Sequence, residues 1–398
     1  MADADKLAID GGQPVRNSML PYGRHAVNDD DIAAVTSVLR SAWLTAGPKV
    51  ADFQRAFAAK VGSRHAAAVS SGTAALHAAM FALEVTGGDE VIVPAMTFAA
   101  TANAVVFEGG SPVFADVEPD TLLIDVESIS DRITARTRAV IAVDYAGQPC
   151  DYDRLQAVAD RHGIAVVADA CHALGAAYHG RPVGSLADLS TFSLHPVKHV
   201  TAGEGGVVTT DDSELVPRLE MFRNHGMSAD HAARDRADSW YYEIRELGYN
   251  YRLSDLQCAL AMSQLSRLEE QVNRRQQIAR VYDRAFASLD GIRQLATRPD
   301  CRHAYHLYVV RLGLGRFRDG RRRVFQALRA EGIGVNVHYI PVHLHPLYRG
   351  RFGTGPGLCP VAEAAYEEII SLPLFPTMTD RDVQDVIDAV VKVHKAYS

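Results

Sequence analysis

The stretch FSLHPVKHVTAGEGGVV, residues 192–208, joins the end of one predicted strand to the start of another through a loop with a single lysine. Lys198 follows Ser193 by five residues, and three glycines, Gly203, Gly205 and Gly206, lie around the start of the next predicted strand. Glycines let a backbone approach a planar ligand closely. Strand, lysine loop and strand in this order favour an α/β domain with a ligand at the loop.

The chemistry of Lys198 depends on its protonation. A lysine that bonds to a carbonyl must first lose its proton, and both desolvation and nearby cations lower the pKa of an amine. His195 and His199 flank Lys198, and we expect them to contribute such a charge. For a lysine in general, a solvated surface position is the common alternative.

The stretch between residues 66 and 210 alternates short apolar runs with helical segments. In TAALHAAMFAL, for example, Leu76, Met80 and Leu83 recur at helical spacing. The runs predict strands at residues 66–70, 90–94, 112–117, 139–144, 164–169, 190–194 and 205–210. Strands that alternate with helices indicate a mostly parallel sheet covered on both faces, with ligands bound beyond the carboxyl ends of the strands.

The C-terminal part has its own pattern. Residues 251–286 predict one long helix, which begins at a capping box of Ser254 and Gln257. Beyond it we expect a strand at 306–312, a helix at 320–331, a strand at 333–339 and a last helix from about Asp380. The resulting organisation is an N-terminal arm (1–30), a large domain (31–258) and a smaller α+β domain (259–398).

Composition excludes several classes of function. The 398 residues carry a net charge of −7, and the pI is about 6.1, which does not indicate nucleic-acid or anionic-membrane binding. The five cysteines are scattered without a CxxC pair, so we expect reduced thiols and a cytoplasmic protein. No window approaches the roughly 20 apolar residues of a membrane span. We expect no membrane, nucleic-acid or metal partner.

The motif SSGTAAL, residues 70–76, follows a predicted strand and opens a helix. Gly72 allows a tight turn, and the amides of Thr73 and Ala74 would then point out of a helix N-terminus, which attracts phosphate. The Ser193 hydroxyl is a candidate for the same cluster. The motif lacks the ending of a Walker A loop. The alternative is an ordinary strand–helix turn with Ser71 as its cap.

The motif VADACHALGA, residues 167–176, places Asp169 at the end of a predicted strand. A buried carboxylate there suits the pyridine nitrogen of pyridoxal 5′-phosphate (PLP), because the ion pair keeps that nitrogen protonated and the ring an electron sink. His172, three residues later, is within reach of the phenolic oxygen of the cofactor. Taken alone, His172 has an alternative as a surface histidine at a helix start.

Eight motifs follow one another in a fixed order along the chain. They are SSGTAAL, VPAMTFAATANA, DACHALGA, FSLHPVKHVTAGEGG, FRNHGM, ELGYNYRLSD, HLYVV and HYIPVHLHPLY. The ordered set resembles the sugar aminotransferase family of fold-type I PLP enzymes, from about Leu20 to the C-terminus. The segment LPYGRHAVNDDDI, with DACHALGA and FSLHPVKH, is most similar to the branch that serves pseudaminic acid biosynthesis.

The resemblance implies roles for residues that hold the cofactor. Lys198 would bond to PLP as an imine and move a proton between Cα and C4′, and Asp169 would pair with the pyridinium. Phe98 would stack on the ring, although a core aromatic is an even alternative. The phosphate would be held by Gly72, Thr73, Ala74 and Ser193. His172 departs from the pattern, since many relatives carry glutamine there, which leaves its contact to the phenolic oxygen open.

The resemblance also implies partners. Asn250 would reach the phosphate of the partner subunit's cofactor, which makes the enzyme a homodimer with shared active sites. The sugar pocket would be lined by Thr45, His338, His343 and Tyr348.

The expected reaction moves the amino group of L-glutamate to the 4-keto carbon of a nucleotide-linked deoxy sugar, specifically a UDP-linked 4-keto-6-deoxy-N-acetylhexosamine. Alternatives are a dTDP- or GDP-linked ketosugar, a keto-cyclitol, or a PLP-dependent sugar dehydratase. In those dehydratases histidine replaces the lysine, so Lys198 argues against this class. A nucleotide-sugar oxidoreductase would need a G-x-G-x-x-G after a strand, which is missing. A non-catalytic regulator on the same fold is a further alternative, which Asp169, Ser193 and Lys198 together disfavour.

Overall fold

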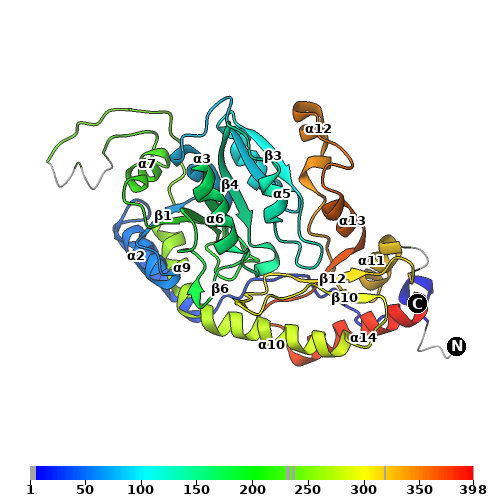
Figure 1. The fold of residues 1–398 in the computed structure, drawn as a ribbon. Coiled ribbons are helices and arrows are strands. Elements are labelled where there is room, and N and C mark those ends of the chain that lie inside the picture. Colours follow the sequence, from blue (N-terminus) through cyan, green and yellow to red (C-terminus); the bar gives the residue numbers. More distant parts are fainter. Residues whose placement is uncertain (1–5, 230–233, 235–237, 318–319, 398) are drawn as a thin grey trace.

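Seven strands form the central sheet. The structure, a computed structural model, describes residues 6–229, 234, 238–317 and 320–397. The strands are β1 (His65–Val69), β2 (Glu90–Pro94), β3 (Ser111–Ala115), β4 (Thr137–Val143), β5 (Ala165–Asp169), β8 (Leu189–Ser193) and β9 (Gly206–Thr210). They lie in the order β1-β9-β8-β5-β4-β2-β3, and β9 alone runs antiparallel to its neighbours. Figure 1 shows β1, β3 and β4 of this sheet. The seven predicted strands and the mostly parallel sheet are confirmed.

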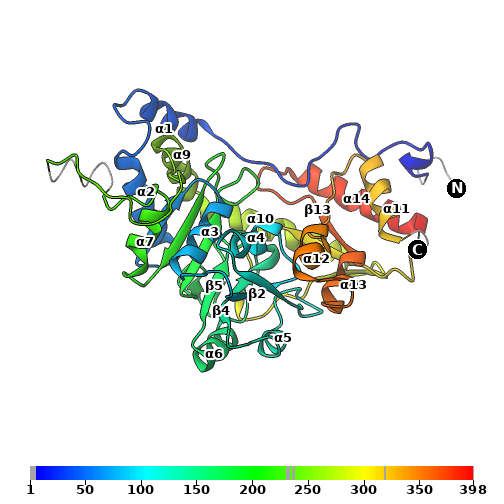
Figure 2. The ribbon, with the colours of Figure 1, turned by 90° about the horizontal axis from the view of Figure 1, so that it is seen from above.

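Helices cover both faces of this sheet. Figure 2 shows α3 and α4 on one side of the strands and α5 and α6 on the other. Ten of the eleven residues of α3 are buried, which explains why its sequence is apolar on every side. The large-domain helices are α1 (Asp29–Leu39), α2 (Pro48–Val61), α3 (Gly72–Ala82), α4 (Ala99–Phe107), α5 (Val126–Ser130), α6 (Tyr152–His162) and α7 (Leu215–Phe222). One short 3-10 helix, η3 (Tyr145–Gly147), follows β4.

The parallel strands end along one edge of the sheet. In register, Val143 of β4 lies opposite Asp169 of β5, and Asp169 lies opposite Thr191 of β8. β1 has the same direction as β8, because each is antiparallel to β9 between them. The loops that carry the predicted site residues after β1, β2, β5 and β8 therefore start from the same edge.

The predicted long helix is two helices, so that expectation was wrong. α9 (Asp255–Ser266) begins at the predicted capping box of Ser254 and Gln257, and α10 (Leu268–Phe286) follows after one residue. At Arg267 the backbone leaves helical geometry, and its amide bonds to the carbonyl of Gln264, three residues back. The Arg267 guanidinium binds the buried Asp31 carboxylate at 2.6 Å. This ion pair ties the break to α1.

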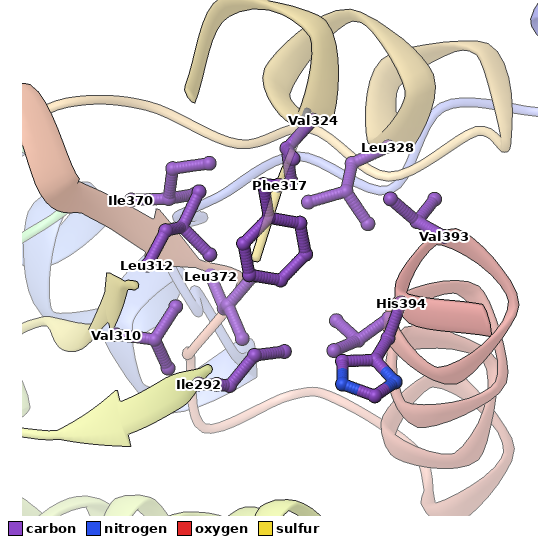
Figure 3. Close-up of a pocket in the computed structure, with 11 residues that line it drawn as sticks. Ile292, Val310, Leu312, Phe317, Val324, Leu328, Ile370, Leu372, Val393 and His394 are labelled. Carbon is purple, nitrogen blue, oxygen red and sulfur yellow. The ribbon is translucent and has the colours of Figure 1, made fainter. Parts of the chain in front are cut away.

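A second, smaller sheet organises the C-terminal part. It has the order β10 (Ile292–Gln294), β12 (Tyr308–Leu312), β13 (Ile369–Leu372), and is antiparallel. Its helices are α11 (Gly320–Ala330), α12 (Pro346–Phe352), α13 (Pro360–Glu368) and α14 (Asp380–Tyr397), with η4 (Val342–Leu344) before α12. The strand at 306–312, the helix from 320 and the helix from Asp380 are thereby confirmed. A separate hydrophobic core lies here, with a small apolar cavity around Phe317 (Figure 3).

The strand predicted at 333–339 was wrong. This segment makes only single bridges, Ile333 to Leu20 and Asn336 to Ser371 of β13. Residues near the N-terminus pack on this core too. Leu7 and Leu20 are buried in it, and the buried Glu331 carboxylate accepts from the amides of Ala8 and Val15. The 3-10 helix η2 (Ala8–Asp10) lies at that contact. The proposed division at residues 30 and 258 stays a prediction.

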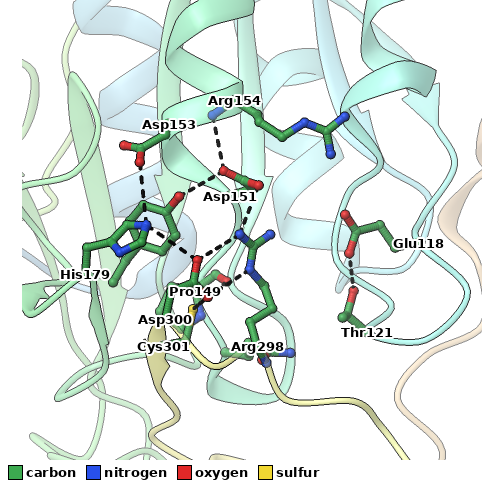
Figure 4. Close-up of polar contacts among 12 residues, drawn as sticks. Glu118, Thr121, Pro149, Asp151, Asp153, Arg154, His179, Arg298, Asp300 and Cys301 are labelled. Atoms are coloured by element: carbon green, nitrogen blue, oxygen red, sulfur yellow. Dashed lines mark hydrogen bonds and ion pairs between the residues drawn. The ribbon is translucent and has the colours of Figure 1, made fainter.

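A small third sheet links the two parts. It consists of β11 (Cys301–Arg302), β6 (Ala177–Tyr178) and β7 (Arg181–Pro182). Beside it, Arg298 pairs with Asp151 at 2.9 Å and with Asp300 at 3.0 Å (Figure 4). Arg298 thus anchors the chain between β10 and β11 to the start of α6. No helix in the described part of the chain is long and apolar enough to cross a membrane.

Candidate active site

The predicted phosphate residues meet at the carboxyl edge of the sheet. A Cβ built on Gly72 would lie only 2.8 Å from Cβ of Ser193 and 3.3 Å from Sγ of Cys171. The start of α3, the end of β8 and the loop after β5 therefore converge on one point, and a larger residue at position 72 would clash. Glycine is required here by close approach.

The N-terminus of α3 has a regular cap. Ser71 is its N-cap, and its hydroxyl accepts a hydrogen bond from the Ala74 amide at 3.0 Å. The Ala74 amide therefore already has one acceptor within the chain. Thr73 is partly buried, and the Ser193 hydroxyl lies across from Gly72. A helix N-terminus flanked by hydroxyl groups suits a phosphate group.

Asp169 is held in place by two threonines. Its side chain is buried, and Oδ2 accepts a hydrogen bond from the Thr101 hydroxyl at 2.7 Å, while Oδ1 accepts from the Cys171 amide at 3.3 Å. Thr97 and Thr101 are 2.7 Å apart through their hydroxyls. An ionised carboxylate only accepts, so Thr101 donates to Asp169 and Thr97 donates to Thr101. The sequence reasoning missed both threonines, although their spacing of four at a helix start is visible in VPAMTFAATANA.

A second carboxyl lies behind Asp169. Asp144 follows β4, and its amide donates to the Asp169 carbonyl at 3.1 Å. Burial raises the pKa of Asp144 to about 7, and the Asp169 charge adds to the rise. Near neutral pH this group is therefore partly protonated, and it adds only part of a negative charge to the site.

Lys198 lies in a loop whose ends are tied together. The Leu194 amide donates to the Gly205 carbonyl at 2.8 Å, which closes the loop. A Cβ on Gly206 would lie 2.2 Å from the Ser71 carbonyl oxygen, so this glycine is needed for packing against the start of α3. The Lys198 side chain is partly buried, with Nζ 3.4 Å from Nε2 of His306.

The environment lowers the pKa of Lys198. Desolvation is the main cause, the charges of Cys171 and Asp169 act in the opposite direction, and the charge of Arg275 adds a smaller decrease. The expectation that flanking histidines supply the cation was wrong. His195 is exposed, and burial holds the pKa of His199 well below its usual value, so that ring is neutral. The cation comes instead from Arg275, 77 residues away in sequence.

His172 has one ring nitrogen engaged and one free. Nε2 lies 3.0 Å from the Tyr339 hydroxyl, and the ring is 4.4 Å from that of His306. Burial lowers the pKa of His172 well below its usual value, followed by the effect of Lys198. Nδ1 is buried and has no hydrogen-bond partner among the described residues. A buried polar atom without a partner fits a ligand group that completes it.

Phe98 and Asn250 are on the surface of this subunit. Phe98 is the N-cap residue of α4, 60% exposed, with its ring 6.0 Å from that of Tyr339. Asn250 is exposed and forms a backbone bridge with Asn224. Its neighbours Tyr249 and Tyr251 stack on each other at 5.0 Å and pack around His77 of α3. The Asn250 segment is thus fixed to the helix that starts at Gly72.

The four predicted sugar-pocket residues have different surroundings. Thr45 is exposed in the turn before α2. His338 is buried with Nδ1 2.8 Å from the Ser371 hydroxyl, and burial, then Lys198, lowers its pKa to about 4. His343 is fully buried and 2.9 Å from Glu363, and Tyr348 donates to Asn103 at 2.6 Å. Only His338 of the four is electrostatically coupled to Lys198 in these contacts, and the pocket assignment stays a prediction.

These groups together fit PLP. A helix N-terminus with a required glycine suits the phosphate, a buried carboxylate suits the pyridinium, and the free nitrogen of His172 suits a phenolic oxygen. A lysine with a lowered pKa completes the set. The geometry indicates an enzyme of the PLP-dependent class.

Comparison with known proteins identifies the family. Residues 25–391 match the DegT/DnrJ/EryC1/StrS aminotransferase family, and the chain belongs to it. It is an aminotransferase with pyridoxal 5′-phosphate as its cofactor, on the fold of the fold-type I enzymes. A relative, the spore coat polysaccharide biosynthesis protein SpsC of Bacillus subtilis, is 43% identical over 384 residues, 96% of this chain and 98% of SpsC.

Two solved structures are similar over nearly their whole lengths. Spr1654 of Streptococcus pneumoniae, in its PMP form, has a TM-score of 0.90 and 32% identity, over 95% of this chain and 99% of that one. PseC of Helicobacter pylori, an aminotransferase involved in the biosynthesis of pseudaminic acid, has a TM-score of 0.89 and 31% identity, over 96% and 100%.

The threonine pair gives a direct test of how Asp169 is held. Thr101→Val keeps the shape but removes the donor to Asp169, and a hydrogen bond to a charged group contributes about 1.5–3 kcal/mol. We expect kcat to fall roughly tenfold or more, with recovery in Thr101→Ser. Thr97→Val is the matched control. It should lower kcat less, because Thr97 acts on Asp169 only through the hydroxyl of Thr101. Equal losses in both valine variants would contradict this order.

Proposed function

We propose that this enzyme transfers the amino group of L-glutamate to the 4-keto carbon of a nucleotide-linked deoxy sugar, namely a UDP-linked 4-keto-6-deoxy-N-acetylhexosamine. The observation that carries the transfer is the pairing of a lysine of lowered pKa, Lys198, with a buried carboxylate, Asp169, at one edge of the sheet. Asp169 ends β5, and Lys198 lies in the loop after the neighbouring strand β8.

Each of the site residues has a separate role toward the cofactor. When bound, the cofactor would supply a carbonyl group and a ring that withdraws electrons. Lys198 would hold the cofactor, and its Nζ would take or return a proton when free. Asp169 would keep the ring nitrogen protonated. Gly72, Thr73, Ala74 and Ser193 would bind the phosphate, His172 would donate to the phenolic oxygen, and Phe98 would cover one face of the ring.

The sugar assignment rests on similarity. PseC, at 31% identity, is described as acting in pseudaminic acid biosynthesis, and the segments LPYGRHAVNDDDI, DACHALGA and FSLHPVKH agree with that branch. Of the assigned sugar residues, His338 is the one whose pKa is lowered in part by the charge of Lys198. We assign Thr45, His343 and Tyr348 to the same pocket from the resemblance.

The dimer proposal has support of its own. The segment before Asn250 exposes large apolar side chains, with Trp240 at 83% and Leu247 at 76%. Exposed apolar groups of this size mark an interaction surface. A second copy seated there would bury the segment, and the contact of Asn250 with the partner's phosphate site is assigned from the resemblance.

The lysine assignment is tested by reduction. Borohydride should fix the cofactor to Lys198 in the wild type, and Lys198→Ala should lose both this label and turnover. Lys60→Ala is a suitable control, since Lys60 pairs only with the partly exposed Glu269 in the described structure. An alanine variant at 198 that still reacts and still carries the label would assign the role to another lysine.

Shared active sites are tested by mixing inactive subunits. Lys198→Ala and Asn250→Ala should each be inactive alone, but a mixed dimer has one site with both residues intact. With random exchange we expect about a quarter of wild-type activity. Subunit exchange is verified by co-purification of two different tags. Exchange without recovered activity would rule out sharing through Asn250.

The acceptor is tested with a panel of ketosugars. UDP-, dTDP- and GDP-linked 4-keto sugars and a keto-inositol are each incubated with glutamate, and the products are identified by mass spectrometry. A site that hydrogen-bonds particular hydroxyls rejects analogues strongly, so we expect kcat/KM for the UDP sugar to be roughly 100-fold higher or more. Faster amination of another acceptor would keep the aminotransferase and replace the sugar. Loss of a hydroxyl without amination would indicate a dehydratase.

A further inference from the structure

Arg275 is a buried cation without a carboxylate partner. It lies on α10 and is 1% exposed. Its NH1 donates to the carbonyl oxygens of Leu374 at 2.8 Å, Tyr305 at 3.3 Å and His306 at 3.4 Å, and its NH2 donates to that of Val197 at 3.5 Å. Its Nε has no partner, and no ion pair to it occurs within the described ranges.

This arrangement is energetically unusual. A buried charge normally has a counter-ion, because desolvation costs several kcal/mol. The next residue back, Arg274, differs, because it is partly exposed and binds the Asp380 carboxylate at 2.9 Å and the Met378 carbonyl at 2.7 Å. Arg275 has only carbonyl oxygens, and burial lowers its pKa to about 10, so it stays charged at neutral pH. Such an exception calls for a physical reason.

The acceptors of Arg275 lie on the segments that surround Lys198. Val197 directly precedes the lysine in the chain. His306 gives its carbonyl to Arg275, and its ring nitrogen Nε2 lies 3.4 Å from the Lys198 amine. Leu374 comes from the C-terminal part, just after β13. One guanidinium therefore hydrogen-bonds to three segments that are far apart in the sequence and that lie around Lys198.

Arg275 differs in charge from the other ionisable groups around Lys198. Burial leaves the nearby histidines neutral, namely His172, His199, His306 and His338. Asp169 and Cys171 act to raise the pKa of the lysine, and Arg275 acts to lower it. Among these neighbours, Arg275 is the cation that opposes the effect of Asp169.

We propose that Arg275 is a positioning residue for Lys198, which anchors the segments around the amine and keeps an unneutralised positive charge beside it. The inference rests on the proposed role of Lys198. Burial is the main reason that the pKa of Lys198 is lowered near the Asp169 carboxylate, and Arg275 adds to this effect. An amine must lose its proton to attack a carbonyl, and a cation held nearby favours that form.

Three variants separate the charge from the fold. Arg275→Met removes the charge and keeps the length, Arg275→Lys keeps the charge but loses the fork, and Arg274→Met is the matched control on the same helix. In cofactor-free protein, an amine-acylating reagent is applied between pH 6 and 10, and the modification of Lys198 is followed by peptide mass spectrometry. Circular dichroism and thermal unfolding verify the fold of each variant.

We expect the rate of Lys198 labelling at pH 7 to fall roughly threefold or more in Arg275→Met, with little change in Arg275→Lys or Arg274→Met. Wild-type labelling in Arg275→Met would overturn the proposal, as would an equal fall in Arg274→Met. If the methionine variant does not fold, Arg275→Lys decides: wild-type labelling there supports the charge as the agent, and a fall would overturn the proposal that the charge suffices.

The same samples separate this inference from the proposed function. Borohydride reduction and peptide mapping of the wild-type holoenzyme identify the lysine that holds the cofactor. A label on a different lysine would refute the proposed function, while the acylation rates would still report on the influence of Arg275 on Lys198. A label on Lys198 with unchanged acylation in Arg275→Met would refute only the inference.

Discussion

The parallel pairing of β4, β5 and β8 is the constraint on which the site depends. It sets Asp169 opposite Val143 on one side and Thr191 on the other. A register slip of one residue would turn the carboxylate to the other face of the sheet. The Thr101 hydrogen bond and the start of α3 are placed relative to this edge, so the chemistry depends on strand register before it depends on any single contact.

Much of this arrangement was predictable from sequence, because the motifs that mark it lie in short stretches of the chain. Strand ends at Asp169 and Ser193 and the glycine turn at Gly72 are visible in short windows, and parallel strands bring their ends together. The break at Arg267 was not predictable, because it is tied to Asp31, far away in sequence. The strand expected at 333–339 was also wrong: Ile333 and Val335 are buried in the C-terminal core, but the segment pairs only through single bridges to Leu20 and Ser371.

The residues that tune the site are harder to find from sequence than those that form it. His306, Tyr339 and Arg275 reach Lys198 or His172 from segments more than 70 residues away, and no local pattern marks them. The prediction for His199 was wrong because a histidine next to Lys198 in the sequence was assumed to be charged. Once buried beside the Ala304 carbonyl, at 3.0 Å, it is neutral.

The site has to meet two opposing electrostatic demands. The ring nitrogen needs an anion, which Asp169 provides, but the same anion favours the protonated form of Lys198. Burial offsets this effect in part, because it penalises the charged amine. It also leaves the surrounding histidines neutral, so they add no repulsion. A guanidinium held by backbone carbonyls has no carboxylate to cancel it, and this distinguishes Arg275 from the paired Arg274. Burying this charge lowers the stability of the folded protein, and the other contacts of the fold must offset that loss. The charge in turn acts on the pKa of a single amine, that of Lys198.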